Sequence, residues 1–183
     1  IETDRSGTHL KNIEKFMNVD WLGIMRIESP ANNYQYYENI YQVALSQLGK
    51  GYDFNFDVET THKLVCSELL YQSFGDTVWP TEDYLGRTTI SPDNVASLSL
   101  YGKSPLSLVY YIKGNEEKKI INLSEETLAI DLGFKKNLEL STDAQNIYEK
   151  AYKKCVIVQK GKKKIKVCHI AYKNYEYESM VNY

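Results

Sequence analysis

The chain has 183 residues, a hydrophobic content of 43% and a formal net charge of −2 at pH 7. This length and apolar content suit one globular domain with an appendage, and the near-zero net charge gives no general attraction to nucleic acid or anionic membranes. We therefore expect no nucleic-acid partner. No stretch approaches the roughly 18 apolar residues of a transmembrane helix, and no signal peptide is visible.

The first half of the chain predicts short strands that alternate with helices. The clearest helix is predicted at 33–48, where apolar residues recur at helical spacing and two glycines follow. A second amphipathic helix is predicted to begin at Cys66, and Ser91 is predicted to cap a third, with Pro92 at its first position. The predicted elements in chain order are a strand end at 1–3, helix 10–17, strand 21–27, helix 33–48, helix 66–74, a loop at 75–88, helix 91–98 and strand 106–112.

The second half predicts strands at 118–123 and 129–132, then a helix at 142–153. A β-hairpin is predicted after that helix, around Gly161-Lys162, a pair suited to a type II′ turn. In the register that this turn sets, Val158 lies opposite Ile165 and Lys160 lies opposite Lys163.

The same register places Cys155 opposite Cys168, with Cα atoms expected about 4.5 Å apart. A cross-strand disulfide is feasible at this separation, and the alternative is two reduced, packed cysteines. The bridge would suit an exported protein, so the expected location is the cell envelope or outside the cell. In either case Cys66 is the odd thiol.

Cys66 opens its predicted helix, where unsatisfied backbone N–H groups and the positive end of the helix dipole favour a thiolate. The thiolate is the nucleophilic form of cysteine, so Cys66 is the candidate nucleophile. The alternative is a small buried hydrophobe, which is the commoner fate of a free cysteine.

The residues around Cys66 carry a resemblance. Tyr52-Asp53, followed at a distance by Val65-Cys66-Ser67-Glu68-Leu69, resembles the circularly permuted NlpC-like cysteine hydrolases, the YiiX/YaeF-like branch of the papain-like superfamily. Three further pieces agree with this resemblance, and together the match covers roughly residues 1–112. These pieces are Ile1-Glu2-Thr3 with Gly7-Thr8-His9-Leu10 after it, Gly49-Lys50-Gly51, and Ile90-Ser91-Pro92-Asp93-Asn94.

The resemblance implies an α+β, papain-like, circularly permuted fold with a small antiparallel sheet packed by helices. The hydrolase core would span residues 1–113, and residues 114–183 would form an extension, with a helix and a hairpin, that packs on the core. The implied chemistry is thiol-dependent hydrolysis of an amide or ester, or acyl transfer, with a peptide or lipid as substrate. Cys66 would be the nucleophile, Glu2 would orient an imidazole, and Tyr52 would either donate to the oxyanion or serve as a packed aromatic.

The family's histidine strand should lie just upstream of the strand that contains Glu2, and the given sequence starts at Ile1. We therefore expect either a missing N-terminal segment or a partner chain to supply the catalytic histidine. His9 could stand in as the base or lie on the surface. His62 would share a face with Cys66 only if the helix began near Thr60, and His169 is expected to be structural. A non-catalytic binding module that keeps the hydrolase fold is the alternative.

No cofactor and no metal site is expected. Asp53, Asp57 and Glu59 lack the glycine and closing glutamate of a calcium loop, so a solvated acidic face is the better interpretation. The lysines at 160–166 suggest either edge protection of a hairpin or an anionic partner.

Overall fold

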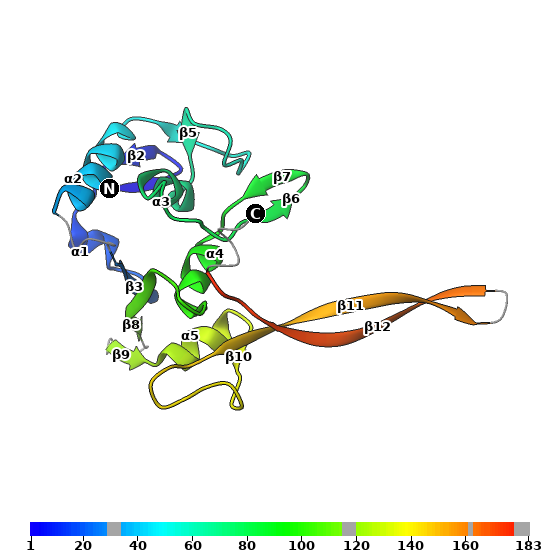
Figure 1. Ribbon diagram of the computed structural model, residues 1–183. Coiled ribbons are helices and arrows are strands. Elements are labelled where there is room, and N and C mark those ends of the chain that lie inside the picture. Colours follow the sequence, from blue (N-terminus) through cyan, green and yellow to red (C-terminus); the bar gives the residue numbers. More distant parts are fainter. Residues whose placement is uncertain (29–33, 115–119, 161–162, 178–183) are drawn as a thin grey trace.

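The computed structural model of the protein describes residues 1–28, 34–114, 120–160 and 163–177 (Figure 1). Its helices are α1 (Ile13–Phe16), α2 (Tyr34–Ser46), α3 (Cys66–Ser73), α4 (Pro92–Ser97), which a 3-10 turn follows, and α5 (Glu125–Asp131). Its strands are β1 (Glu2–Asp4), β2 (Gly7–His9), β3 (Trp21–Ile27), β4 (Gly51–Tyr52), β5 (Lys63–Leu64), β6 (Glu82–Tyr84), β7 (Arg87–Thr89), β8 (Leu106–Gly114), β9 (Ile120–Leu123), β10 (Phe134–Lys136), β11 (Tyr148–Lys160) and β12 (Lys163–Asn174). Small, separate sheets among helices give the α+β class that the sequence predicts.

The N-terminal residues form a β-hairpin that is tied to the middle of the chain. In this hairpin of β1 and β2, Thr3 pairs with Thr8, and their buried hydroxyls lie 3.0 Å apart. The outer edge of β2 meets the turn before β4, where the Thr8 N–H donates to the Lys50 carbonyl at 2.8 Å. Strand β4 runs parallel to β5, and α3 begins directly after β5 and packs on both β1 and α2. Residues near the N-terminus and at Cys66 therefore share one layer.

A second sheet lies beside this layer, with strand order β3-β8-β9 and antiparallel pairing throughout. Its β3 strand contributes Ile27 to a buried apolar cluster, which α4 and the segments around Trp79 complete. The buried members of this cluster are Ile27, Val58, Trp79, Ile90, Leu98 and Leu106. A smaller cluster of Leu100, Ala129, Phe134 and Tyr148 lies beneath α5 and β10.

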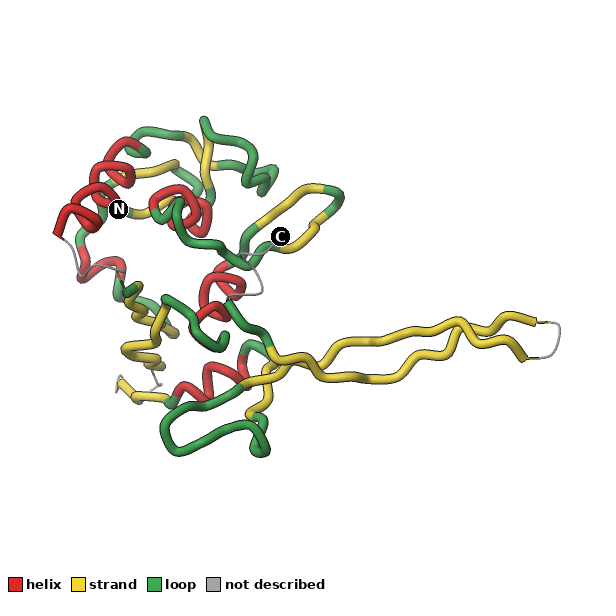
Figure 2. Tube along the Cα trace, viewed as in Figure 1, coloured by secondary structure: helices red, strands yellow, loops and turns green. Residues whose placement is uncertain are grey.

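The longest strands, β11 and β12, form a hairpin that projects from the body as an arm (Figures 1 and 2). We use "arm" for residues 151–172. Between 151 and 170 the described residues are all exposed, except Cys155 and Cys168, which are half-buried. Both ends of the hairpin are fixed to the body, because Tyr148 is buried in the smaller cluster and the Gly102 N–H donates to the Tyr175 carbonyl at 2.9 Å.

The arm confirms the predicted hairpin register. Val158 pairs with Ile165, Lys160 pairs with Lys163, and Cys155 pairs with Cys168 and forms a disulfide with it. The disulfide settles the choice that the sequence left open. The type II′ turn at Gly161-Lys162 falls outside the described residues.

Two predictions in the second half are wrong. Residues 129–132 were expected to form a strand, but they belong to or follow helix α5, whose start Ser124 caps by accepting the Thr127 N–H at 3.1 Å. The helix expected at 142–153 is a loop followed by β11. Its apolar residues have helical spacing, but Tyr148 is buried through the pairing of β11 with β10, and this tertiary contact overrides the local pattern.

The other predicted elements are present with shifted ends. Strand 21–27 matches β3, and the helices predicted at 33–48 and 66–74 match α2 and α3. The helix predicted at 10–17 shrinks to α1, which Asn12 caps. The region 75–88, expected to be a loop, contains β6 and the first residues of β7. No helix in the described ranges is both long and apolar enough to cross a bilayer.

Candidate active site

Cys66 is the first residue of α3, and its side chain is exposed. Val65 precedes it in extended conformation as the N-cap. The first backbone bond of the helix runs from the Leu69 N–H to the Val65 carbonyl at 3.1 Å. The N–H groups of the turn that contains Cys66 therefore have no acceptor within the helix, and they point toward the region of the thiol.

Two buried side chains next to Cys66 fix the start of the helix. The Glu68 carboxylate accepts the Val65 N–H at 2.9 Å, which is the half of a capping box that a valine N-cap allows. The Ser67 hydroxyl donates to the Ile90 carbonyl at 2.6 Å, and this bond ties α3 to the segment that leads into α4. The thiol thus sits on a backbone turn that is held from both sides.

Glu68 has no solvent exposure, and its Oε1 atom has no hydrogen-bond partner among the described residues. Burial raises the pKa of Glu68 to about 7, and the Val65 N–H opposes this shift while the charges of Asp53 and Asp57 add to it. The neutral acid is therefore well populated near neutral pH. Protonation of Glu68 removes a full negative charge from the helix turn that carries Cys66.

A pocket of about 440 Å³ opens at Cys66. Its lining comes from the N-terminal segment, α1, α3 and the start of α4, and it consists of Ile1, Glu2, Thr3, Phe16, Cys66, Ser67, Leu69, Leu70 and Pro92. The hydroxyls of Thr3 and Ser67 are already engaged with Thr8 and Ile90. Among the described lining residues, Glu2 is therefore the one besides Cys66 whose side chain offers an ionisable group to the pocket.

The Glu2 carboxylate is largely shielded from solvent and lies against a cation. Lys11 Nζ donates to Glu2 Oε1 at 2.9 Å and lies 2.8 Å from Oε2 in an ion pair. His9 is the cross-strand partner of Glu2 in the β1–β2 hairpin, and its Nε2 atom lies 3.9 Å from Glu2 Oε2. The structure thus brings Glu2 next to both the pocket of Cys66 and an imidazole.

The three histidines have different surroundings. His9 Nδ1 lies 3.0 Å from the Gly7 carbonyl oxygen, and its Nε2 atom faces Glu2 and Asp4. His62 precedes β5 and is exposed, and because α3 begins at Cys66 the two do not share a helix face. His169 lies on the arm opposite Lys154. Among the described residues no histidine forms a hydrogen bond with Cys66 Sγ, and His9 is not part of the pocket lining.

Tyr52 lies on β4, next to β5 and the start of α3. Burial raises the pKa of its hydroxyl, and negative charge at Cys66 raises it further, which indicates that the two side chains lie within electrostatic range. Like other tyrosine hydroxyls, it is protonated and able to donate at neutral pH. Its ring also packs edge-on against Phe54, with the centroids 4.9 Å apart.

Asp53 was expected on a solvated acidic face, but it is a buried structural residue. Its carboxylate accepts the N–H groups of Asn55 and Asp57 at 2.9 and 3.1 Å and so holds the loop after β4. A different group could hold an ion, since side-chain atoms of Glu2, Asp4 and His9 all lie within 4.8 Å of one another. Both carboxylates of that group are engaged within the protein, since Lys11 pairs with Glu2 and Asp4 accepts the Ser6 N–H and hydroxyl at 2.8 and 2.6 Å.

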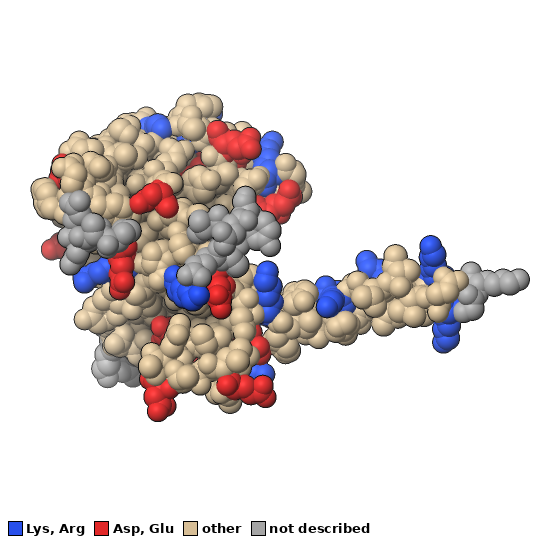
Figure 3. All heavy atoms as spheres, in the orientation of Figure 1, with Lys and Arg blue, Asp and Glu red and all other residues tan. Residues whose placement is uncertain are grey.

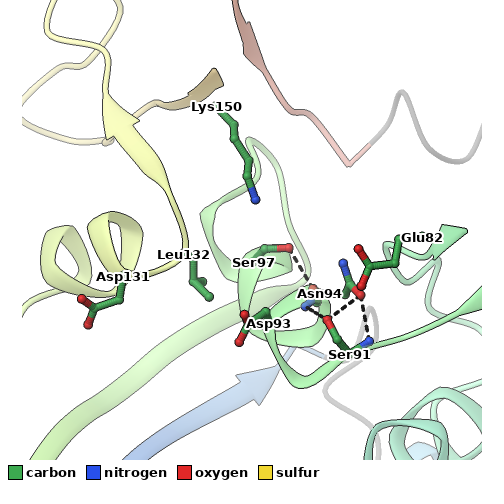
Figure 4. Close-up of a pocket in the computed structure, with 8 residues that line it drawn as sticks. All are labelled: Glu82, Ser91, Asp93, Asn94, Ser97, Asp131, Leu132 and Lys150. Atoms are coloured by element: carbon green, nitrogen blue, oxygen red, sulfur yellow. Dashed lines mark hydrogen bonds between the residues drawn. The ribbon is translucent and has the colours of Figure 1, made fainter. Parts of the chain in front are cut away.

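A second pocket of about 180 Å³ lies between α4, α5 and β11 (Figure 4). Three of its polar lining residues form hydrogen bonds with one another at α4. The Ser91 hydroxyl donates to Asn94 Oδ1 at 2.6 Å, the Asn94 N–H donates back to Ser91 Oγ at 3.1 Å, and the Ser97 hydroxyl donates to the Asn94 carbonyl at 2.9 Å. These bonds confirm the predicted cap at Ser91.

Some residues of the Cys66 pocket were not identified from the sequence. Phe16 and Pro92 reach it from α1 and α4, which are distant in the chain, so no local pattern marks them. Leu69 and Leu70 follow Cys66 at helical spacing on one face of α3, so a local pattern places them beside the thiol. The burial of Glu68 was missed, since a glutamate in a first helical turn is usually exposed.

A family model described as "Permuted papain-like amidase enzyme, YaeF/YiiX, C92 family" matches residues 1–139, which is more than half of the chain. The matched range contains every residue that lines the Cys66 pocket, and it ends after β10 and before the arm. It also extends past the 1–112 range of the sequence resemblance. Comparisons with curated proteins and with solved structures found no match.

Proposed function

The chain belongs to the permuted papain-like amidase family, and we propose that it is a thiol-dependent hydrolase or acyltransferase that attacks an amide or ester through Cys66. The observation that carries the proposal is the position of this thiol. It is exposed at the first residue of α3 and opens into a pocket whose other ionisable lining group is Glu2.

The proposed reaction begins when a base removes the proton from Cys66 and the thiolate attacks the acyl carbon. The carbonyl oxygen gains negative charge, which the unpaired N–H groups of the first turn of α3 stabilise. The carbon–nitrogen or carbon–oxygen bond then breaks, the protonated base returns its proton to the leaving group, and a thioester remains on Cys66. Water or another acceptor attacks the thioester and releases the thiol.

Tyr52 is proposed as an additional donor to the oxyanion. The electrostatic interaction between its hydroxyl and Cys66 supports this role, because it indicates that the two side chains lie close enough for the hydroxyl to reach a substrate carbonyl at Cys66. The packing of its ring against Phe54 would fix the direction of the hydroxyl.

The proposed base is an imidazole that Glu2 orients. His9 is one candidate, since its Nε2 atom lies 3.9 Å from Glu2 Oε2. The other candidate is a histidine outside the described residues, carried by a preceding segment or a partner chain. Among the described residues no strand pairs with the second edge of β1, and the exposed apolar residues Ile13 and Phe16 line a small pocket together with Glu2. An added strand at this edge would cover those residues and would place a side chain next to Glu2.

The substrate is proposed to be a cell-wall peptide or a lipid, and the protein is proposed to act in the cell envelope or outside the cell. The Cys155–Cys168 disulfide supports an oxidising compartment. The pocket lining supports an apolar group next to the acyl carbon, because Phe16, Leu69 and Leu70 flank Cys66. We also propose that residues 1–113 form the NlpC-type hydrolase core that carries this activity.

One observation favours a second candidate function. In the described part of the chain Cys66 has no imidazole partner, so a binding module that keeps the fold without catalysis is the alternative. Activation of the thiol separates the two functions, since only catalysis requires a reactive thiolate.

The first test is the rate of Cys66 alkylation as a function of pH, with Cys66→Ser as the blank. The disulfide removes the other two cysteines from the assay. For an activated thiol we expect half-maximal alkylation well below the value of about 8.5 that is usual for cysteine. His9→Gln and Glu2→Gln then identify the base. If His9 is the base, both variants raise the midpoint, and if it is not, only Glu2→Gln does.

The second test is capture of the acyl-enzyme by intact mass after incubation with activated esters and amides of peptide and fatty acids. A mass increase that Cys66→Ala abolishes supports the proposal, and the acyl group that accumulates identifies the substrate class. An ordinary alkylation midpoint together with no adduct would leave the binding module as the function.

A further inference from the structure

The arm differs in charge from the rest of the molecule. Residues 151–172 contain seven lysines and no aspartate or glutamate, whereas the whole chain has a net charge of −2. The body is therefore acidic and the arm cationic, and the view in Figure 3 shows lysines on the arm and acidic side chains over the body. An anionic partner would be attracted to the arm and repelled by the body.

The two faces of the arm are not equivalent. On one face, the cross-strand pairs Val156–Val167 and Val158–Ile165 are adjacent and make a continuous patch of four β-branched residues. All four are exposed, between 39% and 44%. We call this patch the aliphatic face.

On the opposite face Ile157 and Ile170 each lie opposite a lysine, so they do not join into a patch. The Cys155–Cys168 disulfide lies between the Ile157–Lys166 pair and the Lys153–Ile170 pair. Only the aliphatic face therefore offers a continuous apolar surface.

Cations border the aliphatic face at both ends. Lys160 pairs with Lys163 at the end near the tip, and Lys154 pairs with His169 at the end near the body. Two like charges directly across a strand pair destabilise it, and an anion that lies between Lys160 and Lys163 would remove this repulsion. The long lysine stems also allow the aliphatic residues to enter an apolar layer while the ammonium groups stay at its charged boundary.

From this arrangement we propose that the arm is a membrane-docking element whose aliphatic face lies on a bilayer that contains anionic lipids. A bilayer surface offers phosphates immediately next to hydrocarbon, which matches lysines that border an aliphatic patch. A nucleic acid offers phosphates without hydrocarbon and would leave the four aliphatic residues unused. An isolated two-stranded hairpin is marginally stable in water, so a surface that covers one face also stabilises the arm.

The proposal does not depend on catalysis, and its test uses the full chain with Cys66→Ser so that the two proposals succeed or fail separately. Binding is measured by co-sedimentation with vesicles of phosphatidylcholine alone and with vesicles that contain about one third phosphatidylglycerol. We expect binding to the anionic vesicles only, and we expect it to weaken strongly as salt rises from about 0.05 to about 0.5 M.

Two pairs of matched variants locate the surface. Val158→Ser with Ile165→Ser should weaken binding by about tenfold or more, whereas Ile157→Ser with Ile170→Ser, on the opposite face, should leave it within about twofold. Lys160→Gln with Lys163→Gln should weaken binding on the order of thirtyfold, because each lysine near an anionic surface contributes roughly fivefold to the affinity. Lys15→Gln with Lys63→Gln, on the body, should have no effect. The Cys155–Cys168 bridge, read by mass under non-reducing conditions, reports whether each arm variant keeps its hairpin.

Three results would overturn the proposal. The first is no sedimentation of the parent protein with anionic vesicles. The second is equal loss of binding in the variants of the two faces, or in the arm and body lysine variants. The third is binding to poly-glutamate with the same dependence on the aliphatic face but no binding to vesicles, which would assign the arm to an acidic protein partner.

Discussion

Among individual residues, Glu68 combines features that rarely occur together in a first helical turn. It is fully buried, it caps the turn that carries Cys66, and one of its oxygens has no partner among the described residues. A buried polar atom without a partner has a cost in stability, and protonation reduces that cost. Glu68 therefore links the stability of the Cys66 turn to pH.

The sign of this link follows from the pKa. Burial raises the pKa of Glu68 from 4.5 to about 7, so between these values the folded protein holds a proton that the unfolded chain has released. The contribution of Glu68 to stability is then largest at low pH and falls as pH rises from 4.5 to 7.

We predict that Glu68→Gln removes this pH dependence, because the glutamine oxygen still accepts the Val65 N–H but the side chain cannot ionise. Relative to the parent, the variant should gain on the order of 1–3 kcal/mol between pH 4.5 and pH 7. Urea unfolding at several pH values measures this difference, with the exposed Glu14→Gln as the control. A difference between parent and Glu68→Gln that stays constant with pH would contradict the prediction.

Among elements, the junction of β2 with the turn before β4 holds the strand that carries Glu2. Gly7 begins β2 with φ of +102°, and a Cβ atom added there would lie 2.5 Å from the Lys50 carbonyl oxygen. The same carbonyl accepts the Thr8 N–H that fixes the junction. Both the backbone conformation and the close approach require glycine at this position.

We predict that Gly7→Ala costs about 2–4 kcal/mol in the free energy of unfolding and lowers the reactivity of Cys66, because β1 and Glu2 must shift. Gly86→Ala is the matched control, since Gly86 also has a positive φ, of 76°, but a Cβ there would meet nothing within 4 Å. That control should cost only about 1–2 kcal/mol. Chemical denaturation of the two variants, with Cys66 alkylation as a second readout, checks the prediction, and equal costs would show that the contact with Lys50 does not matter.

The elements that the sequence predicts well are those whose signals are local. Helix α3 begins at Cys66 as expected, the cap at Ser91 is present, and the register of the arm follows from a Gly-X turn and two cysteines at matched distances. Helix α5 was missed although Ser124 followed by Glu125 and Glu126 is a typical helix start. The strand that begins at Tyr148 was missed because its partner is β10, and such pairing leaves no local trace.

In the candidate site, too, the residues with local sequence signals could be predicted, whereas contacts between distant segments could not. Cys66, Tyr52 and Glu2 could be proposed from short motifs, and the structure places Glu2 and Cys66 in one pocket, with Tyr52 in electrostatic range of the thiol. The approach of Phe16 and Pro92 to that pocket, and the ion pair of Glu2 with Lys11, depend on how distant segments pack. These contacts became visible only once the fold was known.

For the molecule as a whole, the body and the arm obtain their stability in different ways. The body has two buried apolar clusters, whereas the arm has exposed side chains, main-chain pairing and one disulfide. The anchors of the arm belong to the body: Tyr148 is buried, and the Tyr177 hydroxyl accepts the Val78 N–H at 3.1 Å. The arm should therefore unfold or be removed without loss of the body.

We predict that replacing residues 153–170 with an Asn-Gly turn leaves the melting temperature of the body within a few degrees, because the pair Tyr152–Ala171 alternates in phase with Lys160–Lys163 and can close directly on a two-residue turn. Tyr148→Ala, which empties a buried site at the anchor, should instead cost about 3–5 kcal/mol. Differential scanning calorimetry compares the two variants. A large loss of stability in the shortened protein would mean that the arm supports the body through contacts beyond its anchors.

The pairing of β11 with β12 also limits how the arm can change in length over evolution or by design. Side chains alternate between the two faces of the hairpin. One residue added to each strand near the body would therefore turn every side chain between the insertion and the tip to the opposite face. An insertion or deletion near the body therefore keeps the aliphatic patch and the two cysteines on their present faces, relative to the body, only if it changes each strand by two residues. Relatives with arms of other lengths should accordingly differ in steps of four residues, and a designed longer arm should follow the same step.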